Sequence, residues 1–188
     1  LVCNEDKTRL KQLSKFQLSY NQFKDLSLFA EEKSVIFFST PFDLKSAEFL
    51  NSIQPLFKIA SGDNNFFPLI DIVAQFKKPM IVSTGVADLD LIKKIYNRIF
   101  SIWKNKNSNP GLALLHCVSS YPVPHDQANL STISFLNKEF PDVAIGYSDH
   151  TLGINAAVSS VFCGAKIIEK HFTIDKNYSD FRDHKLSA

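Results

Sequence analysis

The stretch Ala144–Asp175 reads AIGYSDHTLGINAAVSSVFCGAKIIEKHFTID. Two short runs that favour strands, at 143–147 and 166–170, are separated by a segment rich in Ala and Ser that is typical of a helix. The order of strand, helix and strand predicts two parallel strands joined by a right-handed crossover. Both strands then end on the same rim of one sheet.

A polar cluster closes each of these two runs: Ser148, Asp149 and His150 close the first, and Glu169, Lys170 and His171 close the second. Because the strands are neighbours, we expect His150 and His171 to lie side by side. Two imidazoles with an acid beside them suit a divalent metal ion. The same placement also fits two rim histidines that only make hydrogen bonds, so the residues alone leave both interpretations open.

The same design recurs along the chain in six strand-then-helix units, with strands starting near residues 35, 57, 80, 112, 143 and 165. Steps of roughly 20 to 30 residues are the size of a βα unit, and near-continuous apolar runs are typical of parallel strands buried on both faces. Each strand ends in small polar residues: Ser39 and Thr40, Ser61 and Asp63, Ser83 and Thr84, Ser119 and Tyr121, Ser148 to His150, and Glu169 to His171. Function in parallel α/β folds lies at that rim.

Apolar residues spaced by three and four predict the helices. The spacing over 5–33 indicates one amphipathic helix or two, with a break near Ser19, which can form a capping box with Gln22. Asp43 can cap a helix that runs to Ile53. Further helices are expected from 69 to 76, 88 to 103 and 131 to 140.

Two parallel α/β folds fit this pattern, an open doubly wound sheet and a (β/α)8 TIM-type barrel. No glycine-rich nucleotide fingerprint follows the first strand, which weakens the doubly wound sheet. A barrel needs eight units and typically about 250 residues. We therefore predict a barrel of which about six of the eight βα units are present, with unpaired edges at the strands near 35 and 165.

Composition excludes several classes of protein. The 188 residues carry a formal charge of only +2, with basic and acidic residues interspersed, so neither nucleic acid nor a membrane is an expected partner. No apolar run reaches the length of a membrane span and no signal sequence is visible. The three cysteines, two of them in apolar segments, indicate reduced thiols in a cytoplasmic protein. The chain begins without Met and reads like part of something longer.

The strand ends, taken together, resemble the sialic acid synthase family, whose members make N-acetylneuraminic acid and the related legionaminic and pseudaminic acids. The motifs are FFSTPFD, FKIASGD, PMIVSTG, LLHCVSSYPVP, IGYSDHTLGI and AKIIEKHFTID, followed by a D-H-K-x-S segment from Asp183. The resemblance covers about residues 35 to 187. GYSDHT followed by EKHFT and D-H-K-x-S is the specific part of this combination.

The resemblance implies condensation of phosphoenolpyruvate with an N-acylmannosamine-type sugar and release of phosphate. It implies that His150 and His171 bind the catalytic metal, usually manganese, with magnesium as the other candidate. Positions that hold phosphoenolpyruvate in the family match Thr40, Lys58, Ser61, Ser83 and Ser148, positions that face the sugar match Tyr121 and Asp183, and Ser119 matches a further substrate contact. Lys58 and short hydroxyl side chains suit a phosphate and a carboxylate. Ser119 departs from the family, which has asparagine there.

The resemblance also places this chain within a larger protein. Residues 1–188 are expected to form a partial synthase barrel domain, without the family's first two strands, which carry a glutamate proposed as base, and without its C-terminal antifreeze-like domain. That domain completes the partner's site in the family, which implies a homodimer of the full-length parent. Two alternatives stay open, a metal-dependent pyruvate aldolase and a non-catalytic barrel fragment.

Overall fold

The computed structural model describes residue 11 and residues 14–188, and at its centre is a parallel sheet with the strand order β1-β2-β3-β4-β5. The strands are β1 (Phe57–Ile59), β2 (Met80–Ser83), β3 (Leu112–Cys117), β4 (Ala144–Asp149) and β5 (Ile167–Lys170). All four pairings are parallel. Each strand lies beside the strands that precede and follow it in the chain, which is the winding of a barrel. A doubly wound sheet reverses its strand order.

The sheet is strongly curled. Lys58 lies on the first strand of the sheet and Glu169 on the last, yet Lys58 Nζ is 3.2 Å from Glu169 Oε2. In a flat sheet, edge strands four spacings apart would be separated by about 19 Å. The two edges therefore approach each other across a concave interior, as they do in part of a barrel. The described residues show five strands of such a barrel, and its closure into eight is not seen.

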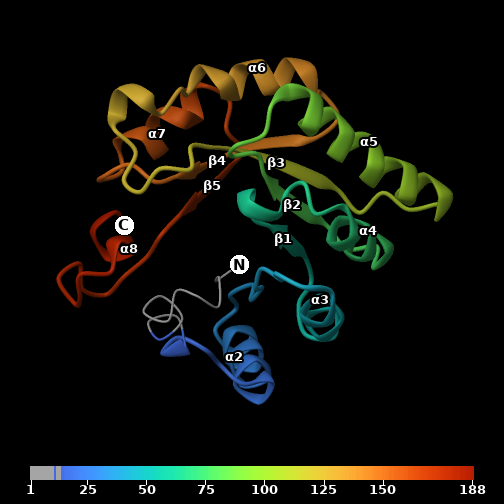
Figure 1. Ribbon diagram of the computed structural model, residues 1–188, viewed down its shortest axis with the longest axis horizontal. Helices are drawn as coiled ribbons and strands as arrows, with labels where there is room; N and C mark the ends of the chain where they lie inside the picture. The colour runs from blue at the N-terminus through green and yellow to red at the C-terminus, as the bar shows by residue number, and fades with distance from the viewer. Residues whose placement is uncertain (1–10, 12–13) are drawn as a thin grey trace.

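Helices lie on the convex side of the sheet, beyond its first edge and, for the last helix, at the rim beside His171. They are α2 (Tyr20–Glu32), α3 (Leu44–Leu50), α4 (Phe67–Gln75), α5 (Leu89–Asn105), α6 (Ser131–Glu139), α7 (Asn155–Phe162) and α8 (Arg182–Lys185), with 3₁₀ turns η1 (Ser61–Asp63) and η2 (His125–Gln127). Helices α4 to α7 form a row along the sheet, whereas α2 and α3 lie beyond β1 (Figure 1). In the part of the chain that is described, no helix combines the length and the apolar character needed to cross a membrane.

Local sequence signals place the helix starts as predicted. Ser19 and Gln22 form the capping box of α2, Asp43 accepts from the backbone N–H of Ser46 at 2.8 Å, and Asp88 caps α5 in the same way through Leu91. The helix after Asp43 ends at Leu50 rather than at Ile53, and turns replace its last residues. The first part of the helix predicted over 5–33 falls mainly on residues 1–10 and 12–13, which lie outside the described residues.

The strand predicted near residue 35 is wrong, and so is the count of six. Residues 35–40 carry no regular secondary structure and pair with no strand of the described sheet. A parallel strand is stabilised when both of its faces are covered, but Val35 and Ile36 are 62% and 66% exposed. The edges of the sheet are consequently β1 and β5.

The two faces of the sheet differ in chemistry because successive side chains alternate. On the convex face Phe57, Ile59, Val82, Leu114 and Ile145 are buried in the core beneath the helices. The strand register puts five other side chains on the concave face: Lys58, Ser83, Cys117, Ser148 and Glu169. A Cβ on Gly146 would lie 2.5 Å from Leu115 Cδ2 and 2.6 Å from the Ile167 carbonyl oxygen, so glycine is required at this crowded interior position.

Candidate functional site

The two predicted imidazoles meet at the C-terminal ends of β4 and β5. The ring centroids of His150 and His171 are 5.4 Å apart, which confirms their predicted placement side by side. Tyr121 joins them from the loop after β3, with its ring centroid 4.1 Å from that of His150 and 6.0 Å from that of His171. Three aromatic rings from three successive strand ends thus converge on one point of the rim.

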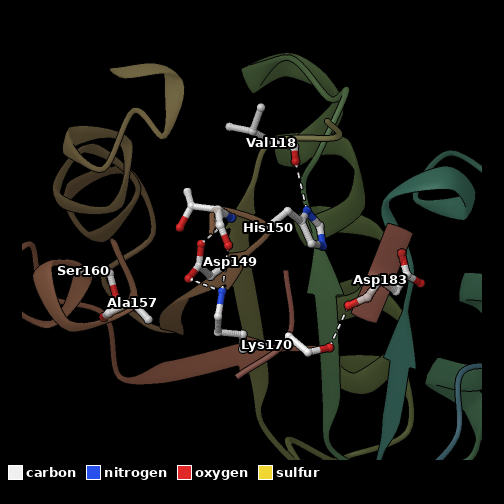
Figure 2. A network of polar contacts seen from close by, with 9 residues as sticks. Val118, Asp149, His150, Ala157, Ser160, Lys170 and Asp183 are labelled. Carbon is white, nitrogen blue, oxygen red and sulfur yellow. Dashed lines mark hydrogen bonds and ion pairs between the residues drawn. The ribbon is translucent and has the colours of Figure 1, made fainter. Parts of the chain in front are cut away.

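The orientation of His150 is fixed by the backbone. Its Nδ1 lies 3.0 Å from the carbonyl oxygen of Val118, as Figure 2 shows. A carbonyl only accepts, so Nδ1 carries the proton and Nε2 keeps the lone pair that a metal ion needs. Metal-binding histidines commonly donate their second ring nitrogen in this way. His171 has an acid beside it instead, with Nδ1 3.7 Å from Asp183 Oδ2, which is longer than a hydrogen bond.

The pair of imidazoles can supply two of the ligands of a divalent ion. Residue 11 and residues 14–188 contain no group of three or more His, Cys, Asp and Glu side chains arranged to hold a metal ion. The remaining positions around an ion at His150 and His171 would therefore belong to water, to substrate or to other protein groups. Catalytic sites keep such open positions, whereas structural sites are closed by protein ligands.

Lys58 lies in the interior of the curled sheet. It is 6% exposed, and its ammonium group forms the ion pair with Glu169 across the concave face. Ser148 Oγ donates to the other carboxylate oxygen of Glu169 at 2.7 Å. Glu169 thereby links two predicted anion-binding residues. It was not among the predicted site residues, and its only sequence signal was its place in the polar cluster before His171.

Gly85 brings two further predicted residues together. Its backbone N–H donates to Ser61 Oγ at 3.1 Å, and a Cβ at Gly85 would lie 2.7 Å from Ser61 Oγ and 2.5 Å from Ser119 Oγ. Both hydroxyls therefore lie against the same backbone position. Asn64, which the sequence analysis missed, donates to the carbonyl oxygens of Ser83 and Gly85 at 3.3 and 3.0 Å and holds this loop.

Ser83 carries a hydroxyl that needs a partner. It is 2% exposed, and its Oγ makes no hydrogen bond within the described part of the chain. Buried hydroxyls are nearly always hydrogen-bonded, so an unpartnered one marks strain or a place for a ligand. Its position on the concave face, one strand from Lys58, favours a ligand.

Of the remaining predicted residues, Asp183 and Tyr121 lie at the site, whereas Thr40 has no described polar contact with it. Asp183, from α8, reaches His171, and Tyr121 lies beneath the guanidinium group of Arg182, whose carbon is 4.3 Å from the ring centroid. Thr40 follows the unpaired segment 35–39 and is half-buried. Among the described contacts, no hydrogen bond or ion pair links Thr40 to another predicted site residue.

Burial and neighbouring groups shift two pKa values at the site. Burial raises the pKa of the Tyr121 phenol, which keeps it a neutral hydrogen-bonding group. Burial alone would also raise the pKa of the Cys117 thiol, but hydrogen bonds with His150 and Ser61 outweigh it and lower that pKa. Cys117 Sγ lies 3.9 Å from His150 Nδ1. These contacts thus favour the thiolate form of Cys117.

Comparison with known proteins adds independent findings. The NeuB family model matches residues 3–188. The uncharacterized protein MJ1065 of Methanocaldococcus jannaschii is 47% identical over 92% of this chain and 49% of its own length. The N,N'-diacetyllegionaminic acid synthase of Campylobacter jejuni is 39% identical over 97% of this chain and 53% of its own. The chain thus spans about half the length of these curated relatives.

A solved structure gives the same picture in three dimensions. The N-acetylneuraminic acid synthetase of Leptospira borgpetersenii, crystallised with citrate, superposes with a TM-score of 0.88 at 36% sequence identity. The match covers 98% of this chain and 62% of that one.

Proposed function

The chain belongs to the NeuB family, and from this premise we propose that its complete protein joins phosphoenolpyruvate to an N-acylated amino sugar of the mannosamine type. The product is a sialic acid or a related nonulosonic acid, and phosphate is released. The observation that carries the proposal is that Lys58 and Ser148 both bind Glu169 on the concave face, which also carries Ser83, while two imidazoles lie side by side at the ends of β4 and β5. The named synthase among its relatives supports the same reaction class.

The concave face supplies an anion site. Lys58 provides a buried positive charge, which Glu169 holds at one end, and a phosphate or carboxylate would gain charge-assisted hydrogen bonds from it. The hydroxyl of Ser83, which has no partner among the described residues, and the hydroxyl of Ser61 offer further donors, while Ser148 donates to Glu169 and can accept. Burying Lys58 costs desolvation energy that its pairing with Glu169 and an anionic substrate would offset.

The outer rim supplies the sugar site. Tyr121, Asp183 and Ser119 present a phenol, a carboxylate and a hydroxyl, groups that hydrogen-bond to sugar hydroxyl and amide groups. The neutral phenol of Tyr121 can both donate and accept. Thr40 is proposed as a further phosphoenolpyruvate ligand on the strength of its motif position alone.

His150 and His171 would hold a divalent ion, manganese or magnesium, which when bound polarises the open-chain aldehyde of the sugar. The carbonyl of Val118 keeps His150 in the tautomer that exposes Nε2. Asp183 Oδ2 lies near Nδ1 of His171. The hydrogen bond to Val118 orients the His150 ring before any ion binds.

Phosphate release tests the proposed reaction. The complete protein, mixed with phosphoenolpyruvate, N-acetylmannosamine or its diacetamido analogue and manganese, should release inorganic phosphate only when both substrates are present. Formation of product from pyruvate without phosphate release would instead assign a metal-dependent aldolase. Absence of both reactions in the complete protein would leave a non-catalytic barrel.

We also propose a cytoplasmic homodimer for the complete protein, on the strength of the family resemblance. Light scattering of the purified protein measures its mass directly. A mass of one chain in solution would contradict the dimer.

A further inference from the structure

The last paired residues of β4 and β5 stand immediately before the two histidines. Ser148 pairs with Glu169, and Asp149 pairs with Lys170, in the parallel register. The side chains alternate between faces, so Ser148 and Glu169 point to the concave interior while Asp149 and Lys170 point to the opposite side. Each strand thus carries one cross-strand contact on each face just before its imidazole.

The contact on the outer side is an ion pair that is almost fully buried. Lys170 Nζ lies 2.8 Å from Asp149 Oδ2, and the two side chains are 8% and 0% exposed. Lys170 Nζ also donates to the carbonyl oxygen of Thr151 at 3.0 Å, and Asp149 Oδ1 accepts from the Thr151 N–H at 2.8 Å (Figure 2). Both charged groups of this cluster have partners, whereas the buried hydroxyl of Thr151 makes no hydrogen bond among the described residues.

Lys170 therefore contacts the residues on both sides of His150. Its ammonium group contacts the residue before His150 through a side chain and the residue after it through the backbone. Lys170 is itself the neighbour of His171. One charged group thus joins the segments that carry the two imidazoles.

Stability does not require such a pair. Isosteric apolar residues often stabilise a core as well as a buried ion pair does, and the better attested use of buried charge is to fix one arrangement. Two other ion pairs between elements, Lys93 with Glu139 and Arg98 with Asp71, lie in more exposed positions and leave the site untouched.

We propose that the Asp149–Lys170 ion pair is a positioning device that sets the separation and orientation of the His150 and His171 imidazoles, and so sets the affinity for a divalent ion. The inference rests on the proposed metal-binding role of the two histidines. Neither Asp149 nor Lys170 is a ligand. Both act through the backbone of the residues beside them.

The test compares Lys170→Met and Lys170→Arg in the complete protein by titration with Mn²⁺, with free ion measured by electron paramagnetic resonance. Loss of groups that orient metal ligands typically weakens metal binding about 10- to 100-fold, and we expect a loss of that size for Lys170→Met. Lys170→Arg keeps the charge and should restore most of the affinity. Lys93→Met, which removes an exposed ion pair elsewhere, should bind Mn²⁺ like the wild type.

A second readout separates positioning from a general loss of structure. The imidazole nitrogen signals of His150 and His171, observed by NMR without metal, should shift or broaden in Lys170→Met and stay unchanged in Val73→Ala, a core variant on α4 with lowered stability. If Lys170→Met does not fold, Asp149→Asn takes its place, because the amide oxygen still accepts from Thr151. Wild-type affinity and unchanged ring signals in a folded Lys170→Met variant would overturn the inference.

The same data show whether the premise, the metal-binding role of His150 and His171, has failed separately from the positioning inference. If the wild-type protein binds no Mn²⁺, or His150→Ala and His171→Ala bind it as well as the wild type, the proposed metal role is wrong. The part of the inference that concerns metal affinity then fails as well, and the ring signals decide only whether the ion pair positions the two imidazoles. A change confined to Lys170→Met supports it, and no change refutes it.

Discussion

The convex and concave faces of the sheet are made by alternate residues of the same short strands, yet they have different tasks. Phe57 and Ile59 are buried under helices, whereas Lys58 between them reaches across the interior to Glu169. Apart from the Asp149–Lys170 pair at the rim, packing on the convex side is by apolar residues, for which exchanges of similar volume cost little. The concave side consists of specific charges and hydroxyls, one of which, Ser83 Oγ, has no partner among the described residues. Substitutions on the two faces should therefore separate stability from catalysis.

The largest expected effect is the loss of turnover without loss of fold when either rim imidazole is removed. We expect His150→Ala or His171→Ala in the complete protein to abolish phosphate release, because one imidazole cannot hold the proposed ion. Thermal unfolding should stay close to that of the wild type. Turnover at the wild-type rate by either variant would end the metal assignment.

The next prediction concerns the convex face. Ile95 on α5 is fully buried, and Ile95→Ala should lower the free energy of unfolding by about 2–5 kcal/mol through lost burial and a cavity. The KM for phosphoenolpyruvate should not change. Ser83→Ala is the matched control on the concave face. It removes a buried hydroxyl without a partner in the described structure. It should therefore preserve the free energy of unfolding while raising the KM for phosphoenolpyruvate. A stability loss in both variants would break the distinction between the faces.

A smaller effect is expected for the charge of the anion site. Lys58→Ala should raise the KM for phosphoenolpyruvate far more than the KM for the sugar, since a hydrogen bond to a charged group contributes about 1.5–3 kcal/mol. Lys58→Met, which keeps the volume of the stem, separates charge from packing. Steady-state kinetics with each substrate varied in turn measures the difference. Equal effects on both substrates would make Lys58 a structural residue.

Spacing in the sequence was enough to predict the parallel strands and the meeting of His150 with His171, because both follow from local pattern and the handedness of crossovers. It could not reveal the contact of Lys58 with Glu169. These residues lie on the first and last strands of the described sheet and meet only because the sheet curls. Sequence reasoning sees neighbours along a strand, whereas curvature is a property of the whole sheet.

The unpaired segment 35–39 shows the opposite error. Its run of apolar residues is typical of a buried strand, yet the segment carries no regular secondary structure. A strand also needs a partner, and its hydrogen bonds are made with residues distant in the sequence. Ser39 instead donates its backbone N–H to the side chain of Gln54 at 2.8 Å. Pairing is decided by tertiary structure, which explains why a local pattern overestimated the strand count.

The smallest expected effect lies outside both faces, at the start of α3. The side chain and backbone N–H of Ser46 donate to Asp43 and lower the pKa of its carboxyl below its usual value. A carboxyl whose pKa is lower in the folded state stabilises the fold above its unfolded pKa, and that stabilisation is lost as the pH falls through the folded pKa. Asp43→Ala should cost about 1 kcal/mol at pH 7, the typical contribution of an N-cap. The cost should shrink when urea unfolding is repeated near pH 3.

Asp43→Asn keeps the cap without the charge, so its stability relative to the wild type should improve toward acid pH. A constant difference between Asp43→Asn and the wild type across this range would show that the charge of Asp43 does not contribute to stability.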